Sequence, residues 1–213
     1  MAIQQNEIPT IDSYMVNERP QQGSTSAIQS GWDAAASMTP TPTGYAVDFK
    51  HSEKPQVVKF LDQNGPFSSY KQHFLSEKSG MKGYVCIGIT CPLCNVLKSR
   101  AEIKRGFSVV NLSSDPVQRQ RIIASPRFFN NLHMVNATPQ GPLTNGYWAI
   151  SRTGVKQSTT YHVMHVKARD LLEDYGIDPQ VAEAKVAEFK PFTADSIKEH
   201  SYAELLEIAE SLV

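Results

Sequence analysis

The chain has 213 residues, of which 40% are hydrophobic and 20% are charged, and its 21 Lys and Arg residues balance its 21 Asp and Glu residues. No stretch approaches the roughly 20 apolar residues that cross a membrane, and the N-terminal residues lack the basic and apolar regions of a secretory signal. We therefore expect a cytoplasmic protein with no membrane partner.

The zero net charge hides a separation of charge along the chain. Residues 1–43 carry a net charge of −3, residues 44–169 of +11 and residues 170–213 of −8. A basic middle between acidic ends is typical of a polyanion-binding protein whose own tails can compete for the same surface. Pairing of basic and acidic faces within one fold is the alternative.

Residues 1–43 are rich in Gln, Ser, Thr and Pro. This composition is too polar to bury a core, so we expect a flexible N-terminal arm. Within the arm, residues Ile28 to Ala36 could form a short helix that packs Trp32 on the rest of the protein.

Residues 44–169 contain short runs with a period near two, bounded by Gly, Pro, Asn and Ser, which predict a mostly β domain. The predicted strands are Tyr45–Lys50, Gln56–Leu61, Gly83–Ile89, Gly106–Leu112, Asn131–Val135, Gly146–Arg152 and Thr159–Val166. Asp115-Pro116 predicts the start of a short helix through Ile123, because Asp caps helices and Pro favours their first turn. Phe60 and Phe107 lie on apolar faces and are predicted core residues.

Residues 170–213 are acidic, and their apolar period moves toward 3.6 residues, which predicts helices. A first helix, Lys167–Tyr175, ends at Gly176, and Asp178-Pro179 starts a second helix that runs through Phe189. Ser201 and Glu204 form the capping-box pattern of a last helix. Strands followed by helices argue against a doubly wound sheet.

All three cysteines fall within nine residues, at Cys86, Cys91 and Cys94, and His73 lies thirteen positions before the first of them. Zinc takes four sulfur or nitrogen ligands in a tetrahedron, and a Cys-x2-Cys turn can place two thiolates on one ion. His73 would complete a closed site, which is structural because no position stays open for catalysis. His73 is the weakest candidate, since the chain has other histidines at His51, His133, His162, His165 and His200.

Two alternatives to zinc remain open. Cys91-Pro92-Leu93-Cys94 is similar to a thioredoxin-type redox pair at a helix N-terminus, where the helix dipole lowers a thiol pKa. No clear βαβ alternation surrounds the pair, and this interpretation leaves Cys86 and His73 unexplained. The cysteines are also compatible with plain core residues, Cys86 above all.

The sequence resembles the phage-encoded single-stranded-DNA-binding proteins, in which an OB-type barrel carries a zinc ribbon and the chain ends in an acidic tail. The matching residues are Val58–Leu61, Pro66–Phe74, Cys86, Cys91–Cys94, Trp148–Gly154 and Thr159–Tyr161. The gap from His73 to Cys86 is similar to that in the helix-destabilising proteins of T-even phages, although the gap from Cys86 to Cys91 is shorter here. The resemblance covers residues 56–176, and its specific element is the His/Cys cluster.

The resemblance implies an OB-like barrel over residues 44–169 with a zinc knuckle at residues 73–94, followed by the acidic helical segment 170–213. It implies a protein without catalytic activity that holds Zn²⁺ and coats single-stranded DNA, without sequence preference, in phage DNA replication and recombination in the host cytoplasm. It also implies self-association on DNA and contacts with replication and recombination proteins through the acidic segment, which would shield the DNA groove.

Such barrels bind single strands by contacting phosphates with Lys and Arg while bases stack on aromatic rings. The candidate DNA-binding residues are Lys59, Phe67, Tyr70, Lys71, Arg100, Lys104, Arg105, Trp148, Arg152, Lys156 and Tyr161. Core packing is the alternative for each aromatic residue. Two other functions stay open: a thiol–disulfide oxidoreductase that uses Cys91 and Cys94, and a zinc-ribbon module that binds protein or duplex DNA.

Overall fold

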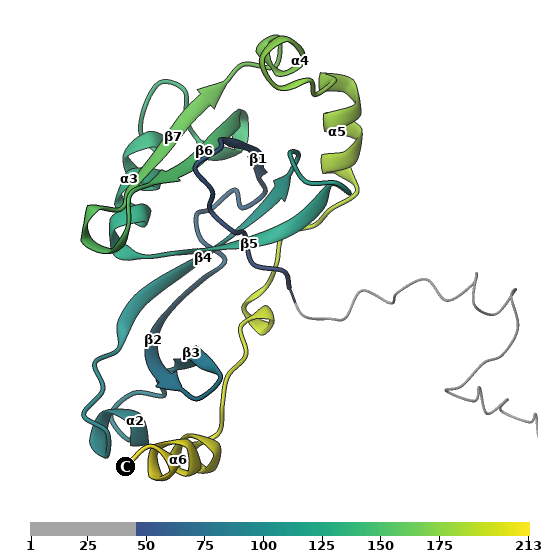
Figure 1. Cartoon of the computed structure of the whole chain (residues 1–213). Coiled ribbons are helices and arrows are strands. Elements are labelled where there is room, and N and C mark those ends of the chain that lie inside the picture. Colours follow the sequence, from purple (N-terminus) through teal and green to yellow (C-terminus); the bar gives the residue numbers. More distant parts are fainter. Residues whose placement is uncertain (1–45) are drawn as a thin grey trace, which may run out of the picture. The chain divides into compact units, whose positions relative to one another are not determined.

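The structure, a computed structural model, describes residues 46–213, so the predicted arm, the helix around Trp32 and Tyr45 lie outside the described residues. Seven strands form one antiparallel sheet (Figure 1): β1 (Gln56–Phe60), β2 (Ser68–Glu77), β3 (Gly80–Val85), β4 (Glu102–Asn111), β5 (Gln118–Ala124), β6 (Tyr147–Thr153) and β7 (Thr160–Val166). The helices are α2 (Pro92–Asn95), α3 (Pro126–Asn136), α4 (Asp170–Tyr175), α5 (Pro179–Ala187) and α6 (Tyr202–Ser211), with short 3-10 turns η1 (Leu143–Asn145), η2 (Lys156–Ser158) and η3 (Ala194–Ser196). The mostly β expectation is confirmed.

The long strand β4 organises the sheet. One edge of β4 pairs with β5, and the other edge pairs first with β2 and then with β1. From β1 the sheet continues to β6 and β7. Strands β5 and β7 do not pair with each other in the described part of the chain, and α3 packs against β4, β5 and β7. The sheet is therefore not closed into a barrel by hydrogen bonds.

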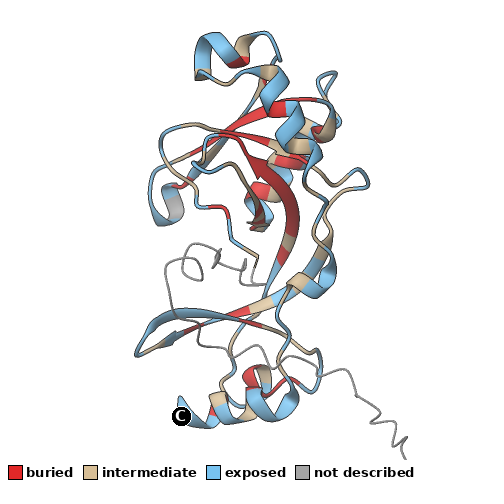
Figure 2. Ribbon diagram, turned by 90° about the vertical axis from the view of Figure 1, so that its right-hand side faces the viewer, coloured by how far each residue is buried: buried red, intermediate tan, exposed pale blue. Residues whose placement is uncertain are grey.

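Strands β1, β4, β5, β6 and β7 with α3, here called the body, have a core on each face of the sheet. Under α3, Phe60 and Phe107 are 2% and 4% exposed, with ring centroids 5.9 Å apart, which confirms both as core residues. On the other face, Leu171 of α4 and Ala182 of α5 pack against strand residues such as Val110. Figure 2 shows how the buried residues concentrate along the strands of the body.

Two predicted elements of the body have the wrong secondary structure. The predicted strand Asn131–Val135 is part of α3, because Ser125 caps this helix by accepting from the amide of Phe128, with Pro126 in the first turn. The predicted helix from Asp115 is instead β5, which pairs with β4 along its whole length. In β5, Gln120, Ile122 and Ala124 face inward, so the period is two.

The strands differ from the prediction in further respects, and β4 begins at Glu102, four residues before its predicted start at Gly106. Strand β2 is absent from the predicted set, and β3 ends at Val85, so residues 86–89 are not strand. The predicted strand Tyr45–Lys50 is reduced, over its described residues, to a bridge between Asp48 and Arg121.

The C-terminal helices are confirmed: Gly176 ends α4 with a left-handed φ of 67°, Asp178 caps α5, and Ser201 and Glu204 form the capping box of α6.

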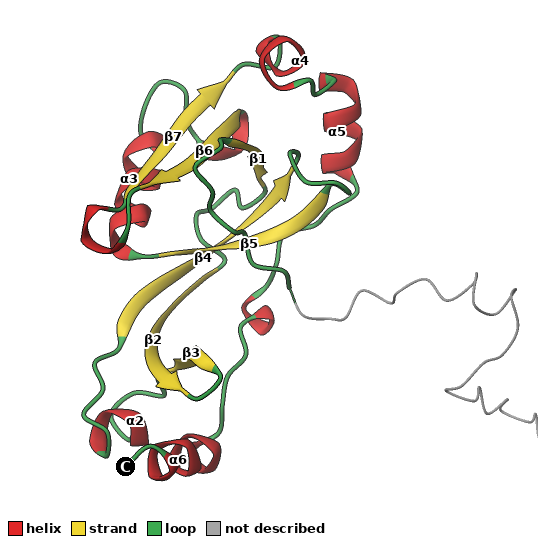
Figure 3. Ribbon diagram, in the orientation of Figure 1, coloured by secondary structure: helices red, strands yellow, loops and turns green. Residues whose placement is uncertain are grey.

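Residues 68–101, which hold β2, β3, α2 and all three cysteines, form a unit here called the Cys/His module (Figure 3). Its small core contains Leu75, Tyr84 and Leu93. Helix α6 completes this core, because Leu205 and Ala209 are fully buried against it. The end of the acidic segment is thus part of the module's packing.

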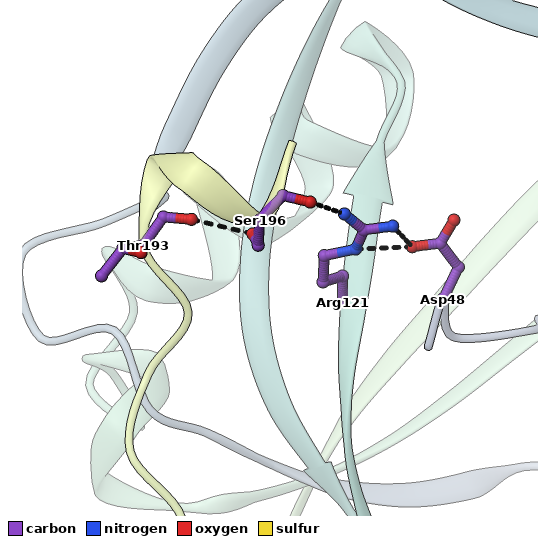
Figure 4. Close-up of polar contacts among 4 residues, drawn as sticks. All are labelled: Asp48, Arg121, Thr193 and Ser196. Carbon is purple, nitrogen blue, oxygen red and sulfur yellow. Dashed lines mark hydrogen bonds and ion pairs between the residues drawn. The ribbon is translucent and has the colours of Figure 1, made fainter. Parts of the chain in front are cut away.

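Residues 188–201, here called the strap, connect α5 to α6 along the outer face of β4 and β5. Arg119 donates a hydrogen bond of 2.7 Å to the carbonyl of Lys190, and its guanidinium lies 3.9 Å from the centroid of the Phe192 ring. Arg121 donates to the carbonyl of Ser196 and forms a 2.8 Å ion pair with Asp48 (Figure 4). The two arginines therefore bind the strap through its backbone.

The partly buried carboxylate of Asp62 supports the start of the strap. Its oxygens accept hydrogen bonds from the amide and hydroxyl of Ser108, and the same hydroxyl accepts from the amide of Phe192 at 2.8 Å. Burial raises the pKa of Asp62 to about 6, although the bonds from Ser108 act in the opposite direction.

Trp148 is 1% exposed and donates from its indole nitrogen to the carbonyl of Leu143 at 2.7 Å. We expect Trp148→Ala to lower the free energy of unfolding by about 3–5 kcal/mol, measured by urea denaturation. The control is Val155→Ala, at a side chain that is 72% exposed, and it should change stability by less than about 0.5 kcal/mol. Equal effects of the two variants would contradict the placement of Trp148 in the core.

Asp62 gives a pH-dependent prediction. Because its folded pKa of about 6 lies above its ordinary value of 3.8, the native state binds the extra proton, and this stabilisation is lost as the pH rises through 6. The stability of Asp62→Asn relative to the unmodified chain should therefore increase between pH 4 and pH 7, in urea titrations with Asp195→Asn as the surface control. A difference that does not vary with pH would refute it.

Candidate metal centre and binding groove

The four predicted ligands come from three neighbouring pieces of the module. His73 lies on β2 and is fully buried, and Cys86 follows β3, where its amide donates to the carbonyl of Lys71 at 2.8 Å. Cys91 caps α2 and Cys94 lies within it. The β2–β3 register, in which His73 pairs with Tyr84, places the histidine beside the turn that carries the cysteines.

The ligand atoms of these residues all lie within 4.8 Å of one another. Nε2 of His73 is 3.6 Å from the sulfur of Cys91 and 3.5 Å from that of Cys94, and the sulfurs of Cys86 and Cys94 are 3.7 Å apart. For an ion 2.3 Å from sulfur and 2.0–2.1 Å from nitrogen, a tetrahedron requires about 3.7–3.8 Å between two sulfurs and about 3.5–3.6 Å between sulfur and nitrogen. These three distances match a tetrahedral site, so the four side chains could hold one metal ion.

The backbone around the cysteines forms a tight turn. The amide of Cys91 donates to the carbonyl of Gly88, and the amides of Cys94 and Asn95 donate to the carbonyl of Cys91, at 3.0–3.1 Å. Gly88 has a left-handed φ of 94°, a conformation that side chains with a Cβ rarely adopt. These bonds hold Cys91 and Cys94 on the same side of the turn.

The pKa values of the Cys91 and Cys94 thiols are shifted in opposite directions. Burial raises the pKa of Cys91, but hydrogen bonds from the amides of Cys94, Ile87 and Leu93 outweigh it and leave this pKa lowered. Burial, and then the neighbouring Cys86 and Cys91 sulfurs, raise the pKa of Cys94 to about 11. A bound metal ion would favour the thiolate form of all three cysteines, because its positive charge attracts sulfur atoms that would otherwise repel one another.

The imidazole of His73 is oriented by a second contact. Its Nδ1 lies 3.1 Å from the hydroxyl of Ser99. Burial lowers the pKa of His73, which favours the neutral ring that a metal ligand requires. With Nε2 on a metal, Nδ1 would carry the proton and donate a hydrogen bond to the hydroxyl oxygen of Ser99, the usual arrangement around metal-bound histidine.

The outer face of the sheet beside the module holds a cavity of about 660 Å³, here called the groove. Its lining residues include Tyr70 and Phe74 on one face of β2, Tyr84, whose ring is buried in the core of the module, and the cations Lys82, Lys104 and Arg121. Phe74 is 42% exposed, and the ammonium of Lys104 lies 4.6 Å from the centroid of its ring. Residues Ile197, Lys198 and His200 of the strap line the opposite side.

The predicted DNA-binding residues do not form one site. Tyr70 and Lys104 line the groove, whereas Lys71 and Arg100 line a separate cavity of about 660 Å³ beside β4 and Pro126. Three other predicted residues lie against single aromatic rings: Lys59 lies over the ring of Tyr147, Arg105 over the ring of Phe129, and Phe67 beside Phe192.

A further three predicted residues lie where β6 and β7 join. Arg152 donates to the hydroxyl of Thr159 at 3.3 Å, and Lys156 is exposed in η2. Tyr161 stacks on Phe128 with centroids 4.5 Å apart. Trp148, contrary to the expectation from the sequence, is a core side chain on which no base can stack, because its ring is enclosed on all sides.

Sequence reasoning missed Phe74, Lys82, Arg121, Lys198 and His200 as groove residues. Phe74 lies four residues after Tyr70 on β2, so an extended segment at this position would have placed both rings on one face. In the same way, a strand at Gln118–Ala124 would have placed Arg119 and Arg121 together on one face.

No protein-family model matches the sequence, and no curated protein matches it. Among residues 46–213, no helix is long and apolar enough to cross a bilayer. The interpretation of the metal centre and the groove therefore depends on their own geometry and chemistry.

We expect the purified protein to hold a single metal ion per chain. Cys94→Ser should lose this ion, and its melting temperature should fall by roughly 10 °C, because ligand binding energy is folding energy in such sites. Elemental analysis and calorimetry measure both, with the exposed turn variant Ser79→Ala as the control. Metal-free protein that cycles between a Cys91–Cys94 disulfide and dithiol would instead support the oxidoreductase.

Proposed function

We propose that this chain is a zinc-stabilised protein that binds single-stranded DNA without catalysing a reaction, with an OB-like body as its framework. The observation that carries the proposal is the composition of the groove: the rings of Tyr70 and Phe74 on β2 lie beside the cations Lys104 of β4 and Arg121 of β5.

The connectivity of the body supports the OB-like interpretation. Its strands occur in the spatial order β5-β4-β1-β6-β7, and α3 lies between the third and fourth strands in sequence. OB folds are five-stranded, partly open barrels that bind oligonucleotides on the face of their second and third strands and on the loops after the first and fourth. Here β4 and β5 are the second and third strands, and the module occupies the connection from β1 to β4.

The chemistry of the groove suits a single strand. Bases stack on exposed rings without sequence preference, and each stack contributes about 1–3 kcal/mol. The groove cations form ion pairs with carboxylates: Lys82 with Glu77, Lys104 with Glu102, and Arg121 with Asp48. Each pair has one partner that is at least half exposed, so solvent screens the pair and a phosphate can compete with the carboxylate for the cation.

Zinc is the metal that the ligand set favours. Three thiolates and one imidazole arranged as a tetrahedron are a typical closed site for structural zinc. The inward-facing ligands leave no open position for a substrate. The zinc would therefore hold the module together and would take no part in chemistry.

Fluorescence anisotropy of a labelled oligo-dT strand tests the proposed function. We expect tight binding that an unlabelled duplex does not displace and that weakens with salt, with a slope near −4 in log K against log salt if about six phosphates are contacted. Duplex displacement would support the alternative duplex-DNA module. Absence of binding at low salt would refute the proposal.

A pair of variants tests the groove. Phe74→Ala should weaken binding by about 5-fold to 150-fold, the equivalent of the 1–3 kcal/mol that one base stack contributes. Met164→Ala, at a side chain of similar exposure on β7 that does not line the groove, is the matched control. Unchanged affinity of Phe74→Ala would place the DNA elsewhere.

A further inference from the structure

One wall of the groove comes from the C-terminal strap. Ile197, Lys198 and His200 line the cavity opposite β2 and β4. The ring of His200 contacts the ring of Tyr84 edge to face, with centroids 5.1 Å apart. On the other side, the carbonyl of Ser196 accepts a hydrogen bond from Arg121, itself a groove residue. This wall is therefore attached to the sheet at both of its ends.

Helix α6 holds the C-terminal end of this wall. The helix begins directly after His200, where Ser201 and Glu204 form its capping box. Leu205 and Ala209 are fully buried against the module, in the cluster that also contains Leu93 and the metal ligand Cys91. The metal centre thus supports the surface on which α6 is seated, and α6 fixes the position of Lys198 and His200.

Lys198 differs from the other groove cations. Lys82, Lys104 and Arg121 each form an ion pair, whereas Lys198 is exposed and forms none within residues 46–213. The nearby carboxylate of Glu204 is engaged by the amide and the hydroxyl of Ser201, at 2.7 and 2.9 Å. A phosphate at Lys198 would not have to displace an ion-paired carboxylate.

We propose that residues 197–200 are part of the single-strand binding surface, with Lys198 as a phosphate-contacting residue, and that α6 is the clamp that holds them in the groove. This inference rests on the proposed function. It assigns the C-terminal segment a role in binding, opposite to the shielding that acidic tails exert.

The negative charge of α6, taken alone, predicts that this helix weakens DNA binding, whereas our inference predicts that it supports binding. Residues 201–213 contain three acidic residues, Glu204, Glu207 and Glu210, and neither Lys nor Arg. If these residues repelled DNA, loosening α6 would tighten binding. If α6 positions Lys198, loosening it weakens binding.

The first experiment compares two single-charge variants of the full chain by anisotropy with oligo-dT. Lys198→Ala should weaken binding by roughly 3-fold to 10-fold and reduce the salt slope by about 0.7, the value of one phosphate contact on a single strand. Lys185→Ala removes the same charge from α5, outside the groove, and is the matched control. Equal effects of the two variants would overturn the inference.

The second experiment loosens the clamp. Leu205→Asp places a charge in the contact between α6 and the module, and Ser211→Asp places the same charge on the exposed end of the helix. With metal content confirmed at the level of the unmodified chain, Leu205→Asp should weaken oligo-dT binding and Ser211→Asp should leave it nearly unchanged. Tighter or unchanged binding of Leu205→Asp would overturn the clamp.

The two proposals fail in different ways. If the unmodified chain does not bind oligo-dT at low salt, the proposed function and this inference are both refuted. If it binds, but Lys198→Ala matches its control and Leu205→Asp binds as well or better, the proposed function stands and only the role of the C-terminal wall is refuted.

Discussion

The cluster of His73, Cys86, Cys91 and Cys94 is the constraint on which, in the function we propose, the rest of the module depends. Strands β2 and β3 extend beyond the body and bury few apolar side chains, and their core consists mainly of Leu75, Tyr84 and Leu93 with the two residues that α6 supplies. A cluster of this size contributes too little apolar burial to order a separate unit in water. A metal ion held by four side chains would supply the missing free energy, because the unfolded chain offers no preformed site.

This dependence extends to the groove through α6 and the strap. The groove has two walls of different origin: a sheet wall that belongs to β2–β5, and a wall from residues 197–200 that is joined to Arg121 and to α6. The sheet wall supplies the exposed ring of Phe74 and the paired cations, and the strap supplies Lys198. In this account the acidic charge of residues 170–213 belongs mostly to helices that pack on the body or on the module. The separation of charge along the sequence therefore reflects the packing of these acidic helices on a basic body and module.

Local signals in the sequence predicted those features that depend on local chemistry. Metal-ligand spacing identified the four residues of the centre, and caps such as Asp178 and Ser201 identified the helices that follow them. Strand β2 was missed because its buried side chains, His73 and Leu75, begin only at its sixth residue, so the segment lacks a continuous apolar alternation. Strand β5 was mistaken for a helix because Asp115-Pro116 is typical of a helix start. Its hydrogen-bonded pairing with β4, which the local sequence does not reveal, makes the segment a strand instead. Of the groove, only Tyr70 and Lys104 were among the predicted binding residues, because the groove brings together two missed strands, β2 and β5, and the strap, which lie far apart in sequence.

The central claim is that the metal centre orders both the module and the C-terminal wall, while the body folds independently of it. Hydrogen–deuterium exchange of the full chain with its metal and after chelation tests this claim residue by residue. The account predicts that chelation increases exchange in residues 68–101 and 197–211 and leaves β6, β7 and the paired region of β4 and β5 protected. Unchanged protection of α6 after loss of the metal, or a uniform increase over residues 46–213, would contradict it.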